Sequence, residues 1–191
     1  MSDYGMSEKV AVVAKESFST NYDVDFYRHL EDIRGGYDIV FEIIDDMKVS
    51  VIVHYQKGEY LPAKNDNIRV MNAKDFIIGI LATIFDTEDA GIDFKDISMF
   101  FANTTSGDFI TYPYETYNLN DVAYRIVSEC RAKMSAAKKV FVLFVGEGSA
   151  FEFSDALDTI LGSTGKNQRN SMYNFVNMKV DRNKVFLYML Y

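Results

Sequence analysis

The longest uninterrupted apolar stretch of the chain runs from Lys139 to Gly148, with the sequence KVFVLFVGEG. Its apolar core is rich in Val and Phe, and it is far shorter than the roughly 20 residues that a membrane-spanning helix needs. A short continuous run of this kind is typical of a strand that other elements cover on both faces. We therefore expect residues 139–145 to form the central strand of a sheet, with packing layers on each side.

The size and composition predict one folded domain. The chain has 191 residues, of which 48% are hydrophobic and 25% charged, and a chain of this length can bury about 70% of the surface that its unfolded form exposes. We expect a single domain over residues 1–191, with 1–8 as a loose amino-terminal segment. The single cysteine, Cys130, and the lack of a secretory signal at the start of the sequence favour an intracellular, cytoplasmic location.

Local patterns place several secondary-structure elements. Asn72 and Asn118 each precede an apolar pattern with helical spacing, as helix caps do. Alternating apolar residues on both sides of Asp45 and Asp46 predict an antiparallel hairpin. We also expect strands at 9–14 and 184–191, helices at 26–33, 154–161 and 171–179, a loop over 56–67, and a second hairpin formed by 97–103 and 108–114.

These elements predict an α+β fold, with a mixed, mostly antiparallel sheet of six or seven strands and three or four helices packed on it. The strand at 139–145 resembles the carboxy-terminal segment KVFLYML closely enough that we expect the two to lie side by side.

Two glycine-containing turns fall short of phosphate-binding motifs. After the strand at 139–145, Gly146-Glu147-Gly148 lacks the third glycine of a dinucleotide-binding turn, because Phe151 stands in its place. The stretch Gly162 to Lys166 lacks both the first glycine and the final Ser or Thr of a phosphate loop. We therefore expect no cofactor.

Catalytic and metal-binding patterns are also incomplete. The loop from Asp86 to Ile97 is acidic, but Ala90 and Ile97 occupy two of the positions at which a calcium loop needs oxygen ligands. Cys130 lies on the apolar stripe of a predicted helix, and no motif connects His29 or His54 to a nucleophile. The sequence therefore predicts no catalytic or metal-binding residues and favours a non-enzymatic protein, with a metal-dependent hydrolase that uses residues 86–96 as the catalytic alternative.

Charge is divided unevenly along the chain. The net charge is -8, which argues against general binding to nucleic acid or anionic membranes. Residues 162–191 have five basic side chains against Asp181, or +4, so residues 1–161 have -12, and segment 16–46 is the acidic extreme. Blocks of opposite sign suit head-to-tail packing of identical subunits or docking to a charged protein partner. We therefore expect an interaction or assembly protein.

The composition and the basic segment leave two further expectations. Fifteen Phe, 13 Tyr and no Trp form a composition similar to that of virus-encoded proteins, which suggests a phage-type structural or host-interaction component in the virion or host cytoplasm. The alternative function is binding of single-stranded nucleic acid by charge and base stacking. Its contacts would come from the late segment: Lys166, Arg169, Tyr173, Lys179, Arg182 and Lys184.

Overall fold

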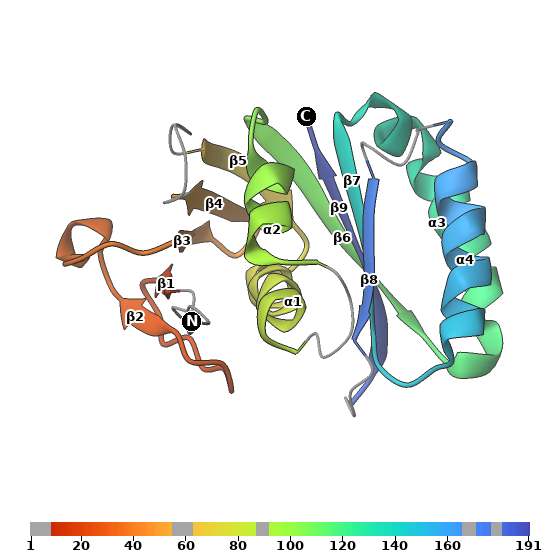
Figure 1. Ribbon diagram of the computed structural model, residues 1–191, viewed down its shortest axis with the longest axis horizontal. Helices are drawn as coiled ribbons and strands as arrows, with labels where there is room; N and C mark the ends of the chain where they lie inside the picture. The colour runs from red at the N-terminus through yellow and green to blue at the C-terminus, as the bar shows by residue number, and fades with distance from the viewer. Residues whose placement is uncertain (1–8, 55–62, 87–91, 166–170, 177–180) are drawn as a thin grey trace, which may run out of the picture.

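The computed structural model describes residues 9–54, 63–86, 92–165, 171–176 and 181–191 (Figure 1). The predicted loose segment 1–8 lies outside these ranges. The strands are β1 (Val10–Val13), β2 (Asp25–Tyr27), β3 (Ile39–Asp45), β4 (Lys48–Val53), β5 (Ala63–Val70), β6 (Ser106–Tyr114), β7 (Lys139–Val145), β8 (Ser171–Val176) and β9 (Asn183–Leu190). The helices are α1 (Ala73–Phe85), α2 (Phe94–Phe101), α3 (Leu119–Ala136) and α4 (Ala150–Gly162), with short 3-10 turns η1 (Leu30–Asp32) and η2 (Thr116–Asn118).

All nine strands form one mixed sheet in the order β2-β1-β3-β4-β5-β6-β9-β7-β8. Four neighbouring pairs are parallel (β1–β2, β1–β3, β5–β6 and β7–β8), and four are antiparallel (β3–β4, β4–β5, β6–β9 and β7–β9). The predicted α+β class with a mixed sheet and four helices is confirmed. The sheet has more strands than the six or seven expected, because β2, β5 and β8 occupy stretches whose sequence patterns predict helices or a loop.

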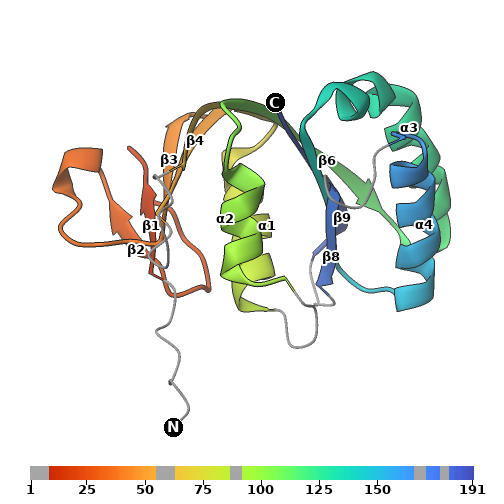
Figure 2. The same cartoon turned by 45° about the horizontal axis from the view of Figure 1, so that its top comes forward.

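The sheet curves around α1 and α2, while α3 and α4 cover part of its opposite face (Figure 2). The inner face packs against α1 and α2 in the larger apolar cluster, which includes Phe41, Phe76 and Tyr188. The outer face of β6, β9 and β7 packs against α3 and α4 in a second cluster, which includes Ile126 and Phe153. A third, small cluster on β1 and β3 is not covered by any of these helices.

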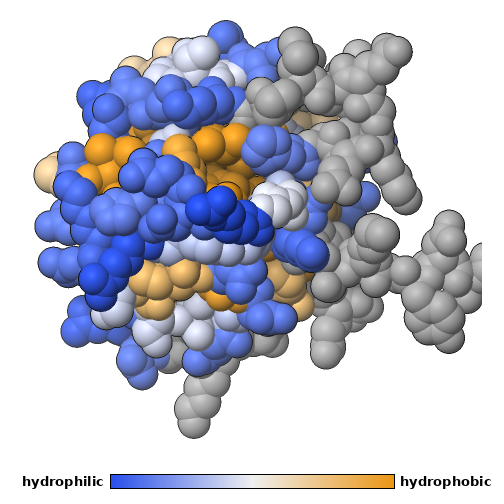
Figure 3. All heavy atoms as spheres, turned by 90° about the vertical axis from the view of Figure 1, so that its left-hand side faces the viewer, coloured by the Kyte–Doolittle hydropathy of each residue, from blue (hydrophilic) through white to orange (hydrophobic). Residues whose placement is uncertain are grey.

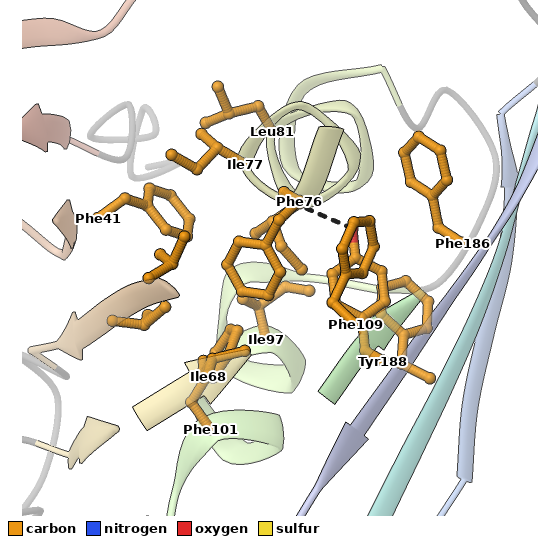
Figure 4. Packing of buried hydrophobic residues seen from close by; sticks show 14 of the residues in the cluster. Phe41, Ile68, Phe76, Ile77, Leu81, Ile97, Phe101, Phe109, Phe186 and Tyr188 are labelled. Carbon is orange, nitrogen blue, oxygen red and sulfur yellow. Dashed lines mark hydrogen bonds between the residues drawn. The ribbon is translucent and has the colours of Figure 1, made fainter. Parts of the chain in front are cut away.

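Phe76 of α1 occupies the middle of the larger cluster (Figure 4). Its ring lies edge-on to Phe109 at 5.3 Å and tilted against Tyr188 at 5.4 Å between ring centroids. The Tyr188 hydroxyl donates a hydrogen bond of 3.1 Å to the Phe76 carbonyl, which lies within α1. One turn further along α1, Gly79 permits this close approach, since a Cβ atom there would lie 2.1 Å from the Tyr188 hydroxyl.

The apolar stretch at 139–145 forms β7, and helices cover both of its faces as expected. Phe141 belongs to the inner cluster and Phe144 to the outer one. β7 also pairs with β9 in antiparallel register, which confirms that the two similar segments are neighbours. The expectation that β7 is central is wrong, since it is the eighth of nine strands. A continuous apolar run indicates coverage on both faces, and it says nothing about position across the sheet.

Other predictions from local patterns are confirmed. β1 and β9 occupy the expected terminal segments, and β3 and β4 form the hairpin around Asp45 and Asp46. Asn72 caps α1 by accepting a hydrogen bond of 2.9 Å from the Asp75 N–H. Asn118 precedes α3, although its side chain makes no capping bond to that helix.

Four local assignments are wrong. The predicted helix 26–33 is strand β2 followed by the single turn η1, and part of the predicted loop 56–67 is β5. The predicted strand 97–103 lies mostly in α2, which begins at a reciprocal capping box between Asp93 and Asp96. The predicted helix 171–179 contains the strand β8 over its described residues. α4 exists as expected but begins earlier, capped by Ser149.

Among the helices in the described ranges, none combines the length and the hydrophobicity that a membrane crossing requires.

Candidate assembly surfaces

The acidic loop that could have held a metal ion uses its described carboxylates for other bonds. Asp86 accepts a hydrogen bond from the Tyr22 hydroxyl. Asp93 and Asp96 bond to each other's backbone N–H groups at the start of α2. The described residues contain no cluster of three His, Cys, Asp or Glu side chains that could hold a metal ion. Glu88 and Asp89 lie outside the described residues, so the metal-dependent hydrolase stays a prediction from the sequence.

The turn after β7 is closed by bonds within the chain. Gly146 has a φ of +135°, which favours glycine, and the Glu147 N–H donates to the Asn183 side chain at 3.1 Å. Ser149 and Glu152 then form a capping box at the amino end of α4. At this turn the backbone N–H groups of Glu147, Ser149 and Glu152 are therefore bonded to the protein's own side chains rather than free for a phosphate.

Cys130 is a buried thiol rather than an exposed nucleophile. Cys130 is on the side of α3 that faces the sheet, and its Sγ atom lies 3.2 Å from the hydroxyl of Tyr112 on β6. Burial raises the pKa of the Cys130 thiol, which keeps it in the unreactive protonated form. His29 precedes η1 and His54 follows β4, and both side chains are exposed. These positions offer no nucleophile and base held together.

The structure describes three of the six predicted nucleic-acid contacts. Tyr173 is exposed on β8, and Arg182 is exposed just before β9. Lys184 is instead partly buried, and its ammonium group forms an ion pair of 2.8 Å with Asp75 at the start of α1. Lys166, Arg169 and Lys179 lie outside the described residues, so binding of single-stranded nucleic acid stays a prediction.

The β8 end of the sheet presents aromatic side chains to solvent. On β8, Tyr173 is 54% and Phe175 41% exposed, and Phe151 at the start of α4 is 75% exposed. Phe175 stacks on the buried Phe153 with ring centroids 5.5 Å apart, so the core of the protein holds its ring in place. No described strand pairs with the other side of β8. Exposed apolar side chains beside an unpaired strand edge are typical of an interaction surface.

The β2 end of the sheet has a different surface. Phe26 and Leu30 are partly exposed there, and the segment that surrounds them is acidic. Tyr37, which lies just before β3, holds β2 in place. Its hydroxyl donates a hydrogen bond to Asp25, and the Tyr27 hydroxyl lies beside it. Figure 3 views the molecule from this side and shows hydrophobic side chains within a mostly hydrophilic surface.

The acidic segment 16–46 has nine carboxylates against two cations, Arg28 and Arg34, so its net charge is -7. None of the nine forms an ion pair with any described residue. Most of them are exposed, and their charge therefore remains available to a partner. The nine are Glu16, Asp23, Asp25, Glu31, Asp32, Asp38, Glu42, Asp45 and Asp46.

Each end of the sheet thus has exposed apolar side chains, and the acidic segment lies at the β2 end. We call residues 16–46 with β2 the acidic end, and β8 with Phe151 the β8 end. The charge division was evident in the sequence. The position of the acidic segment at the β2 end of the sheet was not evident, and neither was the exposure of Phe26, Leu30, Phe151 and Phe175, because both depend on the strand order.

No protein-family model matches the sequence, and no curated protein matches it. Solved structures share part of the fold. The M. jannaschii FtsZ structure described as an empty dimer superposes with a TM-score of 0.53 at 10% identity, over 62% of this chain and 36% of that chain. CetZ2 from Haloferax volcanii, solved as a GTPγS-bound protofilament, gives 0.44 at 12% identity over 62% of this chain and 39% of that chain. TubZ of Bacillus thuringiensis serovar israelensis, solved as GDP-form protofilaments, gives 0.45 at 8% identity over 62% and 35%.

The chain therefore matches little more than a third of the length of each of these structures. At 10% identity the likeness to FtsZ shows a shared fold over part of the chain.

Proposed function

We propose that this protein is a non-catalytic assembly protein whose copies associate head to tail. One observation carries this proposal: both edge strands of a single sheet, β2 and β8, have a side on which no described strand pairs, and each lies beside exposed apolar side chains. The acidic segment around β2 has a charge of -7, and the sequence of residues 162–191 has +4. The apolar centres supply the favourable free energy of contact, and the charges guide the two ends together.

The charge pattern favours unlike ends over like ends. Two acidic ends would bring together the carboxylates of segment 16–46. That like contact is therefore repulsive, which excludes one wrong pairing. A contact between unlike surfaces leaves one free end on each side, so it continues into a ring or an open chain.

Self-association agrees with the description of the M. jannaschii FtsZ structure as a dimer, and that likeness concerns the fold alone. A viral or host-interaction role stays a prediction from the composition.

Salt and charge variants test the proposal by sedimentation velocity. We expect association in about 50 mM salt that declines in about 500 mM salt, because salt screens exposed charges. The paired change Glu31→Gln and Asp32→Asn removes two exposed charges from the acidic end. We expect it to weaken association about two- to tenfold, the size of effect that surface ion pairs give.

The matched control removes two charges from the other end of the molecule. Asp155 and Asp158 are exposed on α4, the helix packed against β8. The change Asp155→Asn with Asp158→Asn raises the net charge equally but should leave association unchanged or strengthen it. Equal effects of the two pairs, or a monomer at every salt concentration, would contradict head-to-tail association.

A further inference from the structure

The backbone of β8 has an open side whose orientation can be assigned. The Val176 carbonyl accepts a hydrogen bond of 3.1 Å from the Gly146 N–H, at the end of β7. Successive residues of a strand direct their N–H and C=O groups to alternate sides. Since Val176 faces β7, Phe175 and Tyr173 direct their backbone groups away from β7, toward the side on which no described strand pairs.

Asn174 occupies part of this open side. The Phe175 N–H, which points away from β7, donates to Asn174 Oδ1 at 2.9 Å. Asn174 is only 2% exposed, and its Nδ2 group is buried without a hydrogen-bond partner. A buried donor without an acceptor lowers stability. Asn174 thus provides the acceptor that a neighbouring strand would otherwise supply, and it leaves one donor unused.

We infer that the open side of β8 accepts strand β2 of a second copy, so that the sheet continues from one copy into the next. This inference rests on the proposed head-to-tail association and names its contact. The incoming strand would accept the Phe175 N–H in place of Asn174 Oδ1, which frees that oxygen for other bonds.

The strand directions favour this pairing. Followed across the sheet, the pairings make β8 and β2 of one copy parallel. If a second copy is placed next to the first in the same orientation, beyond β8, its β2 therefore runs parallel to the β8 of the first copy. The Tyr27 carbonyl accepts the Ala14 N–H on the β1 side at 3.0 Å, so Phe26 directs its own backbone groups to the open side of β2.

Charge disfavours pairing between two β2 edges. Asp23, Glu31 and Asp32 are exposed around β2, so two β2 edges would bring these carboxylates together.

Two substitutions at Tyr173 separate backbone pairing from side-chain contact. Tyr173→Pro and Tyr173→Ala both remove the exposed ring, but only proline also removes the N–H on the open side. Proline is compatible with this position because the lost N–H does not bond to β7. By sedimentation equilibrium, we expect Tyr173→Pro to weaken self-association at least tenfold more than Tyr173→Ala. Equal weakening would overturn strand pairing and leave head-to-tail association through side chains standing.

Amide hydrogen exchange of the unchanged protein covers the case in which Tyr173→Pro fails to fold. We expect the Tyr173 and Phe26 amides to exchange at least tenfold more slowly in concentrated, low-salt solution than in dilute, high-salt solution. Unchanged exchange at both amides in a sample that sedimentation shows to be associated would overturn the inference. An unassociated sample would instead overturn the proposed function on which it rests.

Discussion

Phe76→Ala is expected to lower the free energy of unfolding by about 3–5 kcal/mol, the range for truncating a large buried aromatic side chain. Phe76 is fully buried, and its ring contacts Phe41, Phe101, Phe109 and Tyr188 on surrounding elements. The cavity would lie where α1 meets the curved sheet, enclosed by rigid rings that cannot collapse into it. Urea unfolding followed by circular dichroism measures the loss.

The matched control is Tyr124→Ala, which truncates an aromatic ring of similar size on the exposed side of α3. It should change stability by no more than about 0.5 kcal/mol. A loss below about 1 kcal/mol for Phe76→Ala would show that α1 does not pack into the sheet as described.

Alkaline unfolding is the second large effect that we expect. Burial raises the pKa of Tyr112, Tyr114 and Tyr188 above their ordinary value of 10.0, and burial with the nearby Asp108 raises that of Tyr191 to about 12. Because the folded pKa values exceed the unfolded ones, the folded state retains protons that the unfolded state releases. Stability is therefore fully present below pH 10 and is lost as the pH rises above it.

The slope can be estimated from linkage. Each tyrosine that stays protonated only in the folded state lowers stability by about 1.4 kcal/mol per pH unit, so the three fully buried ones together give about 4 kcal/mol per unit. Urea unfolding at pH values from about 8 to 11 measures this slope. Stability that is unchanged across this range, with phenolate absorbance rising at pH 10 in the folded protein, would contradict it.

Tyr114→Phe is the control for this slope. The Tyr114 hydroxyl is buried without a hydrogen-bond partner, so its removal should be neutral or stabilising at neutral pH. The same change should reduce the alkaline slope by about 1.4 kcal/mol per pH unit.

Elements encoded by local patterns were predictable from the sequence. The β3–β4 hairpin has alternating apolar residues around a two-aspartate turn, and α1 has an asparagine cap before an apolar helix. The sequence does contain the start signal of α2, because Asp93 and Asp96 form its capping box. The same two aspartates also fit an acidic loop, so the pattern alone does not identify the helix. Asp23, just before β2, and Asp25, its first residue, favour a helix start, yet pairing with β1 and the Tyr37–Asp25 hydrogen bond hold β2 extended.

The candidate surfaces were predictable only in part. The acidic and basic segments are evident in the sequence, but the position of the acidic segment at the β2 end depends on strand order, which is set by contacts between distant residues. β8 shows the difficulty clearly, because its extended form depends on parallel pairing with β7. Phe151, Phe153 and Phe175 are chemically alike, and only the packed structure shows which of them solvent reaches.

Mixing two blocked variants tests head-to-tail association most directly. Tyr173→Asp places a negative charge on the β8 end, where it would face the acidic end of a partner, and Phe26→Asp replaces the apolar centre of the acidic end. Each variant retains one working end, so each alone should sediment as a monomer. An equimolar mixture should form a one-to-one dimer and nothing larger. A mixture that stays monomeric, or either variant alone associating as the unchanged protein does, would contradict the account.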